Sequence, residues 1–232
     1  MNITREQDYP ATQVIIAALN EEEGIGPTIS EILANLPAPR LVVVDGRSTD
    51  RTVEIAKNLG ALILSQDGEG KGDAIKKAVK YLDPSVKYTI ITDADYTYPA
   101  QYISEMIQTL EDNPGVGMVC GNRFHGYNDL KGVNNIFYVG NRLIAFTHNL
   151  LNGIQLDDPL TGLRVIRTSI LEKWKVKSQG FDVEVELNHH VERLGFSIVE
   201  TPIFYRARLG KKKLGFQHGA EIIRRIMLES LY

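Results

Sequence analysis

Two aspartates spaced two residues apart, Asp93 and Asp95, are the residues of this sequence best suited to chemistry. They follow the apolar, β-branched run 88–92, which predicts a buried strand. Ligands of open α/β sheets collect at the carboxyl ends of the strands. Two carboxylates there repel each other unless a proton or a cation lies between them. A divalent cation that also holds diphosphate oxygens satisfies both the charge and the coordination, so the pair predicts a Mg²⁺ or Mn²⁺ site.

A purely structural role for the same pair is the alternative. Asp93 can belong to a turn, and Asp95 can cap the helix predicted over 100–111, whose first turn Pro99 suits. For an Asp-x-Asp pair by itself this role is the more common one. The rest of the chain therefore decides between the two interpretations.

The first half of the chain alternates strands and helices. Strands are predicted at 13–19, 41–44, 61–64 and 88–92, each followed by a helix, at 27–36, 51–59, from the loop 67–72 to Leu82, and at 100–111. This pattern predicts an α/β fold with a Rossmann-like, mostly parallel sheet and helices on both faces. A polar cluster follows each of these strands, so the clusters share one edge of the sheet and indicate a ligand crevice.

Three of those clusters hold further candidates. Glu21 and Asp45 each lie just past a strand, where a carboxylate can bind a base or a ribose, or can simply cap a turn. The loop Gly68–Gly72 can hold phosphate through its backbone amides and Lys71, although a flexible turn is the more common interpretation. It lacks the Lys-Ser/Thr pair of a P-loop.

The second half is less regular. Helices are predicted at 134–151, 181–194 and 217–232, and short strands at 163–166 and 196–201. The last helix is amphipathic. The basic run before it can contact a diphosphate, a lipid phosphate or an anionic membrane, or can be a solvated loop. That run comprises Arg206, Arg208, Lys211, Lys212 and Lys213, and the apolar face of the helix comprises Ile222, Ile223, Ile226, Met227 and Leu231.

The composition excludes several classes. A chain of 232 residues with 43% hydrophobic content suffices for one domain, and a net charge of −3 predicts no nucleic-acid partner. The single cysteine, Cys120, allows no intrachain disulfide and is expected to be a buried thiol. The polar segment 1–10 and the lack of an apolar run of about 20 residues predict neither a signal peptide nor a membrane span, which fits a cytoplasmic protein.

Seven short motifs occur in the order found in family 2 glycosyltransferases with the GT-A fold, which the chain resembles from residue 13 to its end. The resemblance is strongest to the dolichyl- or polyprenyl-phosphate sugar synthases, particularly the archaeal ones of protein N-glycosylation. Single motifs of this kind are weak, but seven in order are specific. They are Ala18–Glu22, Val44–Asp50, Gly70–Gly72, Asp93–Asp95, Gly121–Phe124, Asp158–Arg164 and Tyr205–Gly210.

The resemblance implies one catalytic domain over 1–232, with a nucleotide-sugar-binding half, 1–122, and an acceptor-binding half, 123–232. Asp93 and Asp95 would hold Mg²⁺ or Mn²⁺ against the donor diphosphate. Asp158 would be the general base if the acceptor is a hydroxyl, or else a turn residue before Pro159. The other implied donor residues are Ala17, Leu19, Glu21, Asp45, Lys71, Ala94 and Arg206, and the residues implied at the acceptor phosphate or the diphosphate are Arg123, Arg142 and Arg208.

Three positions depart from the family pattern. Ala17 stands where a proline is common, Gly46 where a second aspartate is common, and Thr97 where mannosyl enzymes often carry a metal-binding glutamine. Many relatives continue into transmembrane helices. This sequence ends at an amphipathic helix, as expected of a catalytic domain alone or of a shortened chain.

The implied activity is metal-dependent, inverting transfer of a hexose or N-acetylhexosamine from GDP-mannose, UDP-glucose or UDP-GlcNAc to a dolichyl or polyprenyl phosphate, at the inner face of the cell membrane. A phosphate monoester has a second pKa of about 6, so it is largely ionised at neutral pH and needs no strong base.

Other activities stay open at this point. One is glycosyl transfer to a sugar hydroxyl. Another is a sugar-1-phosphate nucleotidyltransferase, which should carry a Gly-rich signature where Asn20–Glu22 stands. The third is a regulatory binding module with an acidic pocket, which leaves residues 122–232 unexplained.

Overall fold

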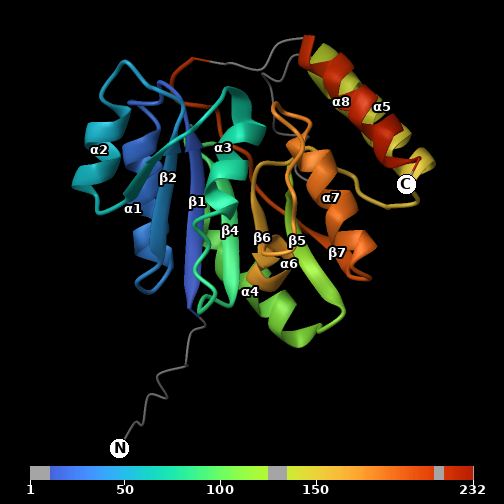
Figure 1. The fold of residues 1–232 in the computed structure, drawn as a ribbon, viewed down its shortest axis with the longest axis horizontal. Coiled ribbons are helices and arrows are strands. Elements are labelled where there is room, and N and C mark those ends of the chain that lie inside the picture. Colours follow the sequence, from blue (N-terminus) through green and yellow to red (C-terminus); the bar gives the residue numbers. More distant parts are fainter. Residues whose placement is uncertain (1–10, 125–134, 212–216, 232) are drawn as a thin grey trace, which may run out of the picture.

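The computed structural model describes residues 11–124, 135–211 and 217–231. They form a seven-stranded sheet between two layers of helices, as Figure 1 shows. The sheet order is β3-β2-β1-β4-β6-β5-β7. The predicted α/β class and mostly parallel sheet are confirmed. The strands are β1 (Thr12–Ala18), β2 (Arg40–Asp45), β3 (Leu62–Ser65), β4 (Tyr88–Asp93), β5 (Val116–Asn122), β6 (Arg164–Arg167) and β7 (Ser197–Pro202).

One strand runs against the others. β6 pairs antiparallel with both β4 and β5, whereas all the other paired strands are parallel. β6 follows β5 in the sequence but lies between β4 and β5 in the sheet. The sequence pattern predicted a strand here but not its place in the sheet.

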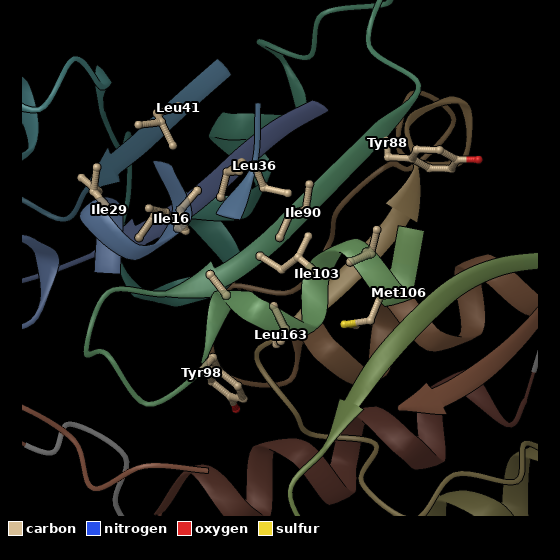
Figure 2. Packing of buried hydrophobic residues seen from close by; sticks show 14 of the residues in the cluster. Ile16, Ile29, Leu36, Leu41, Tyr88, Ile90, Tyr98, Ile103, Met106 and Leu163 are labelled. Atoms are coloured by element: carbon tan, nitrogen blue, oxygen red, sulfur yellow. The ribbon is translucent and has the colours of Figure 1, made fainter. Parts of the chain in front are cut away.

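Successive side chains of the central strands point to opposite faces of the sheet, so the domain has two hydrophobic cores. In β1, Val14 and Ile16 join the core on one face, and Ile15 joins the core on the other, so a continuous apolar run is buried on both sides. Figure 2 shows the first core, where Ile16, Ile29 and Ile90 approach one another from β1, a helix and β4. Cys120 is buried in the second core, as predicted, and burial raises the pKa of its thiol to about 12.

The helices divide between the two faces. One layer consists of α1 (Ile25–Asn35), α2 (Thr52–Asn58), the 3₁₀ turn η1 (Ala100–Tyr102) and α4 (Ile103–Asp112), and the other of α3 (Gly70–Val79), α6 (Thr168–Leu171) and α7 (Val183–Arg193). The helix predicted over 100–111 thus begins with a 3₁₀ turn, and the short α6 was not predicted.

Two further helices, α5 (Asn135–Asn152) and α8 (Gln217–Glu229), lie side by side at one end of the molecule (Figure 1). Ile222 and Ile226 of α8 pack on Val185 of α7, which fixes the pair to the domain. None of the helices in the described part of the chain is both long and apolar enough to cross a membrane.

Candidate active site

The polar residues after the first strands meet at one edge of the sheet. The strand register places Ala17 of β1 opposite Asp93 of β4, and Ala18 of β1 opposite Asp45 of β2. This edge is where the carboxyl ends of the parallel strands come together. The strand register therefore accounts for the predicted clustering of candidate residues.

Asp95 closes a turn and does not cap the helix that follows, so the predicted capping role was wrong. Its Oδ1 accepts hydrogen bonds from the Thr97 backbone N–H at 3.2 Å and from Thr97 Oγ1 at 2.6 Å, which closes the turn after β4. Its Oδ2 lies 3.7 Å from Nη2 of Arg208. Burial and then the negative charge of Asp93 raise the pKa of Asp95, against the lowering effects of Thr97 and Arg208. The pair thus shows the mutual repulsion that a bound cation would relieve.

Asp93 is held by a buried lysine. Lys71 Nζ lies 2.6 Å from Asp93 Oδ1 and 2.7 Å from Oε1 of Glu184 on α7. Burial lowers the pKa of Lys71, but the charges of Asp93 and Glu184 outweigh burial and raise it well above the ordinary lysine value. Lys71 is therefore a buried cation beside the first aspartate.

The predicted glycine loop is the start of a helix instead. α3 begins at Gly70, and a Cβ added to Gly70 or Gly72 would collide with the backbone carbonyls of Gln179 and Ser178. Only glycine lets the first turn of α3 lie this close to the segment that leads into α7. The prediction of a flexible turn was wrong for residues 70–72, and their close packing brings Lys71 to Glu184.

The basic segment after β7 crosses the Asp95 turn. The backbone N–H of Leu209 donates to Asp95 O at 3.0 Å, and Arg208 Nη2 lies 2.6 Å from Oε1 of Glu21. Arg208 thus connects two carboxylates of the site.

Arg206 faces a different partner. Its guanidinium forms a two-pronged ion pair with Glu31 of α1, at 2.6 and 2.7 Å, and lies 4.4 Å from the ring centroid of Tyr96. Its donor contact remains a prediction, and the pair with Glu31 competes with it. Lys212 and Lys213 of the basic run lie outside the described residues.

Asp158 is buried and paired. Arg123 Nε and Nη2 donate to its two carboxylate oxygens at 2.7 Å each, and the Arg123 backbone N–H donates at 3.1 Å. The Arg123 guanidinium lies 5.4 Å from the ring centroid of Tyr205. Glu200 of β7 accepts hydrogen bonds from the backbone N–H groups of Asp157 and Asp158 at 2.8 and 2.7 Å. Both oxygens of Asp158 are therefore engaged by one arginine.

Arg142 lies beside this turn. Its Nη1 is 3.2 Å from Oδ1 of Asp157, and both side chains are about half exposed, at 46% and 61%. It is thus an accessible cation next to the buried Arg123–Asp158 pair.

The motif Asp158–Arg164 also reaches the first aspartate. The Gly162 backbone N–H donates to Tyr98 Oη at 2.7 Å. A Cβ on Gly162 would come within 2.5 Å of Asp93 Oδ2, so only glycine permits this approach. Below it, the buried Arg164 donates to the carbonyls of Thr161 and Pro159, which fixes the turn. The two halves of the chain are therefore joined at the carboxylate pair.

The remaining residues predicted to bind the nucleotide sugar differ in exposure and in contacts. Leu19 is exposed, and Asp45 accepts hydrogen bonds from the backbone N–H groups of Arg47 and Ser48 at 3.0 and 3.1 Å, so it closes a turn. The Ala94 side chain is 2% exposed and belongs to the hydrophobic core, which leaves only its backbone for a ligand.

The carboxylate pair fits a divalent cation that shares its ligands with a substrate. In the described residues no group of three or more His, Cys, Asp or Glu side chains is arranged to hold a metal. Asp93 and Asp95 supply two carboxylates, and Mg²⁺ sites of this kind use one or two carboxylates with phosphate and water oxygens. The raised pKa of Asp95 and the two cations drawn to the pair agree with such a site.

Sequence reasoning missed Glu184, Glu200 and Tyr98. Glu184 lies in the first turn of an amphipathic helix, where a carboxylate is usually solvated, yet its side chain is only 6% exposed. Its position one residue after the apolar Val183 was the available signal, because a carboxylate next to the apolar stripe of a helix can be buried.

Comparison with known proteins identifies the family. Residues 13–175 match the family described as glycosyl transferase family 2. A dolichyl-phosphate hexose transferase of Haloferax volcanii is 32% identical over 94% of this chain and 92% of its own length. A glycosyltransferase of the same organism, AglJ, is 30% identical over 85% of this chain and 64% of its own length.

A solved structure confirms the fold. Glucosyl-3-phosphoglycerate synthase of Mycobacterium tuberculosis, in complex with Mn²⁺, UDP-glucose and phosphoglyceric acid, matches 95% of this chain and 80% of its own, with a TM-score of 0.76 and 20% identity. That protein has the GT-A fold, so the predicted fold is confirmed. The family match decides against the nucleotidyltransferase and the regulatory module. The ordered motifs and the sheet agree with these matches, and the chain belongs to glycosyl transferase family 2 and is a glycosyltransferase.

Proposed function

We propose that this protein transfers a hexose from a nucleotide-diphosphate sugar to a dolichyl or polyprenyl phosphate, with inversion at the anomeric carbon and with Mg²⁺ or Mn²⁺. The related Haloferax volcanii protein is named for dolichyl-phosphate hexose transfer. Solved structures of the same fold contain UDP-glucose with Mn²⁺, or UDP with Mg²⁺. These names support the reaction class and the ligands.

Donor binding is assigned to the carboxylate edge. Asp93 and Asp95 would hold the cation, which when bound offsets the charge that develops on the leaving nucleoside diphosphate. Lys71, 2.6 Å from Asp93, would contact the diphosphate. Arg208 lies at the same edge, next to Glu21 and Asp95.

The pairing of Asp158 carries the choice of acceptor. A sugar hydroxyl must lose a proton to a base, and Asp158 is the base that the motif offers. Its two oxygens each accept from Arg123 at 2.7 Å, and its side chain is 1% exposed. Asp158 can therefore contact a sugar hydroxyl only if its ion pair with Arg123 opens, and breaking a buried ion pair costs free energy. A lipid phosphate avoids this requirement, since it is already ionised at neutral pH.

Replacing Arg142 by Ala tests the acceptor. This half-exposed guanidinium beside the Asp157–Asp158 turn is assigned to the acceptor phosphate. We expect Arg142→Ala to raise the acceptor KM about tenfold or more and to leave the donor KM nearly unchanged, since a charge-assisted contact contributes about 1.5–3 kcal/mol. The measurement is steady-state transfer to a short polyprenyl phosphate.

Arg40→Ala is the matched control for this test. Arg40 forms a partly exposed ion pair with Asp83, with side chains that are 39% and 32% exposed, but it begins β2 and so lies at the opposite edge of the sheet. Its removal should change neither KM. Equal effects of Arg142→Ala on both substrates, or efficient transfer to a free sugar, would contradict the lipid-phosphate acceptor.

A membrane surface is the proposed partner of the α5–α8 pair, consistent with a peripheral position at the inner face of the cell membrane. Large apolar side chains are exposed on both helices and at the end of α8, and a patch of this kind marks an interaction site. Residues 206–225 add seven Lys/Arg against one acid. The exposed apolar residues are Leu143, Phe146, Leu150 and Leu151 on α5, Ile223, Met227 and Leu228 on α8, and Leu231 just beyond α8.

Vesicle co-sedimentation tests this surface. We expect the protein to sediment with anionic vesicles at low salt and to be released by high salt, since each Lys/Arg near such a surface contributes about 1 kcal/mol. Phe146→Asp should abolish sedimentation. Leu33→Asp, at an exposed leucine of α1, should not. A wild-type protein that stays in the supernatant with anionic and neutral vesicles at both salt concentrations would contradict the proposal.

A further inference from the structure

Three charged side chains from three separate elements meet below the carboxylate edge. Lys71 comes from α3, Asp93 from the end of β4 and Glu184 from the first turn of α7. The ammonium nitrogen lies 2.6 Å from Asp93 Oδ1 and 2.7 Å from Glu184 Oε1. The side chains of Lys71 and Glu184 are 9% and 6% exposed. Lys71 is thus shared between a candidate metal ligand and a buried glutamate.

Stability alone does not explain this cluster. Removing charges from water costs free energy, and apolar residues of similar volume stabilise a core equally well or better. One ammonium also serves two carboxylates here. Glu184 Oε2 is buried and has no hydrogen-bond partner among the described residues. A buried cluster of this kind beside a ligand edge is expected to serve the site.

The Asp93 carboxylate cannot bind the Lys71 ammonium and a divalent cation equally well. In this structure its Oδ1 accepts from the Lys71 ammonium. A divalent cation at the Asp93–Asp95 pair would compete for the same carboxylate and would repel the ammonium. Glu184 offers a second carboxylate that is outside the candidate metal pair, so the ammonium keeps a partner when Asp93 changes its own.

A small cavity adjoins the cluster. Its volume of ≈ 10 Å³ is about the least that holds one water molecule, and its lining includes Lys71, Glu184, Gly162 and Arg164. The backbone is fixed close by, because the Asp73 N–H donates to Gln179 O at 3.2 Å. The start of α3 is thus tied to the segment that leads into α7, so the change is assigned to the lysine side chain alone.

We propose that Glu184 is a positioning residue, which retains the Lys71 ammonium beside the site when Asp93 binds a divalent cation, so that Lys71 then contacts the donor diphosphate. The inference rests on the proposed metal and donor site. It assigns to Glu184 no contact with the reacting atoms.

Two variants separate the effects on metal and nucleotide. Lys71→Met removes the competitor of the metal, so we expect Mn²⁺ alone to bind about tenfold more tightly and Mn²⁺-dependent UDP or GDP binding to weaken about tenfold or more. Glu184→Gln leaves the ammonium with Asp93 as its sole anion partner in this cluster. We expect it to weaken both kinds of binding about tenfold. Calorimetry with Mn²⁺ alone, and then with UDP and GDP, measures each affinity.

The double variant tests whether Glu184 acts through Lys71. Lys71→Met with Glu184→Gln removes both charges and avoids an unpaired buried one, so it is the variant most certain to fold. In the Lys71→Met background, Glu184→Gln should change neither affinity further. An equal loss with and without Lys71 would overturn the proposal, because Glu184 would then act directly.

Matched controls come from ion pairs outside the site. Lys77 lies on α3, like Lys71, and pairs with Asp67, so Lys77→Met is the control for Lys71→Met. Glu111 pairs with Lys87, so Glu111→Gln is the control for Glu184→Gln. Both control variants should bind Mn²⁺ and nucleotide like wild type. Glu184→Gln with wild-type affinities would overturn the inference alone. A wild-type protein that binds no nucleoside diphosphate with Mn²⁺ would overturn the proposed function, and the inference with it.

Discussion

Replacing Asp95 by Asn is expected to abolish Mn²⁺-dependent binding of the nucleoside diphosphate while the protein stays folded. The substitution removes one of two anionic metal ligands, and loss of a ligand costs more than the roughly 10–100-fold loss typical of the groups that support ligands. The fold should survive, because an asparagine oxygen can still accept from Thr97, which closes the turn at 2.6 Å in this structure.

Calorimetric titration of UDP, GDP and related diphosphates with Mn²⁺ measures this loss, and thermal melting without ligand checks the fold. Asp112→Asn is the control, because Asp112 ends α4 on the surface and contacts only Gln108 among the bonds described. Unchanged Mn²⁺-dependent affinity in Asp95→Asn would refute the metal site.

Asp158→Asn is expected to lower the free energy of unfolding by about 3–5 kcal/mol, because it leaves the Arg123 guanidinium buried without its counter-charge. The Arg123–Asp158 pair has two 2.7 Å contacts, with side chains that are 16% and 1% exposed. Urea unfolding gives the value. Replacing both partners, Arg123→Met with Asp158→Leu, should recover much of the loss.

Asp157→Asn is the neighbouring control. Its carboxylate is 61% exposed and its ion pair with Arg142 lies on the surface, so the change should stay within about 0.5 kcal/mol. The result also separates two roles for Asp158. Wild-type stability in Asp158→Asn combined with lost transfer would identify a general base and favour a hydroxyl acceptor.

The carboxylate edge was predictable because its causes are local. A continuous apolar run marks each buried parallel strand, and polar residues at its end must lie at the shared edge. Asp93 and Asp45 were located in this way and lie where the pattern placed them. The helices other than the short α6 were likewise located from the sequence, to within a few residues.

What sequence reasoning missed depends on contacts between distant segments. Nothing within Arg164–Arg167 says which strands it joins, and nothing near Glu184 shows that Lys71 will reach it. Gly70 and Gly72 suggested a turn, since glycine disfavours helices, but packing against residues 178–180 overrides that preference. In the loop after β7, no periodicity indicates that Arg206 meets Glu31 whereas Arg208 meets Glu21.

The late insertion of β6 dictates an order of assembly. Strands β1 to β4 can pair with one another as soon as they are synthesised, since each has a neighbour among residues 12–93. β5 cannot, because its partners β6 and β7 begin at Arg164 and Ser197. Until then the open side of β4 and all of β5 expose unpaired backbone groups, which favour aggregation. The predicted division at residue 122 therefore does not separate two folding units, since a fragment ending there would leave β5 without a partner strand. Nascent chains must keep β5 protected until the last third of the protein has emerged.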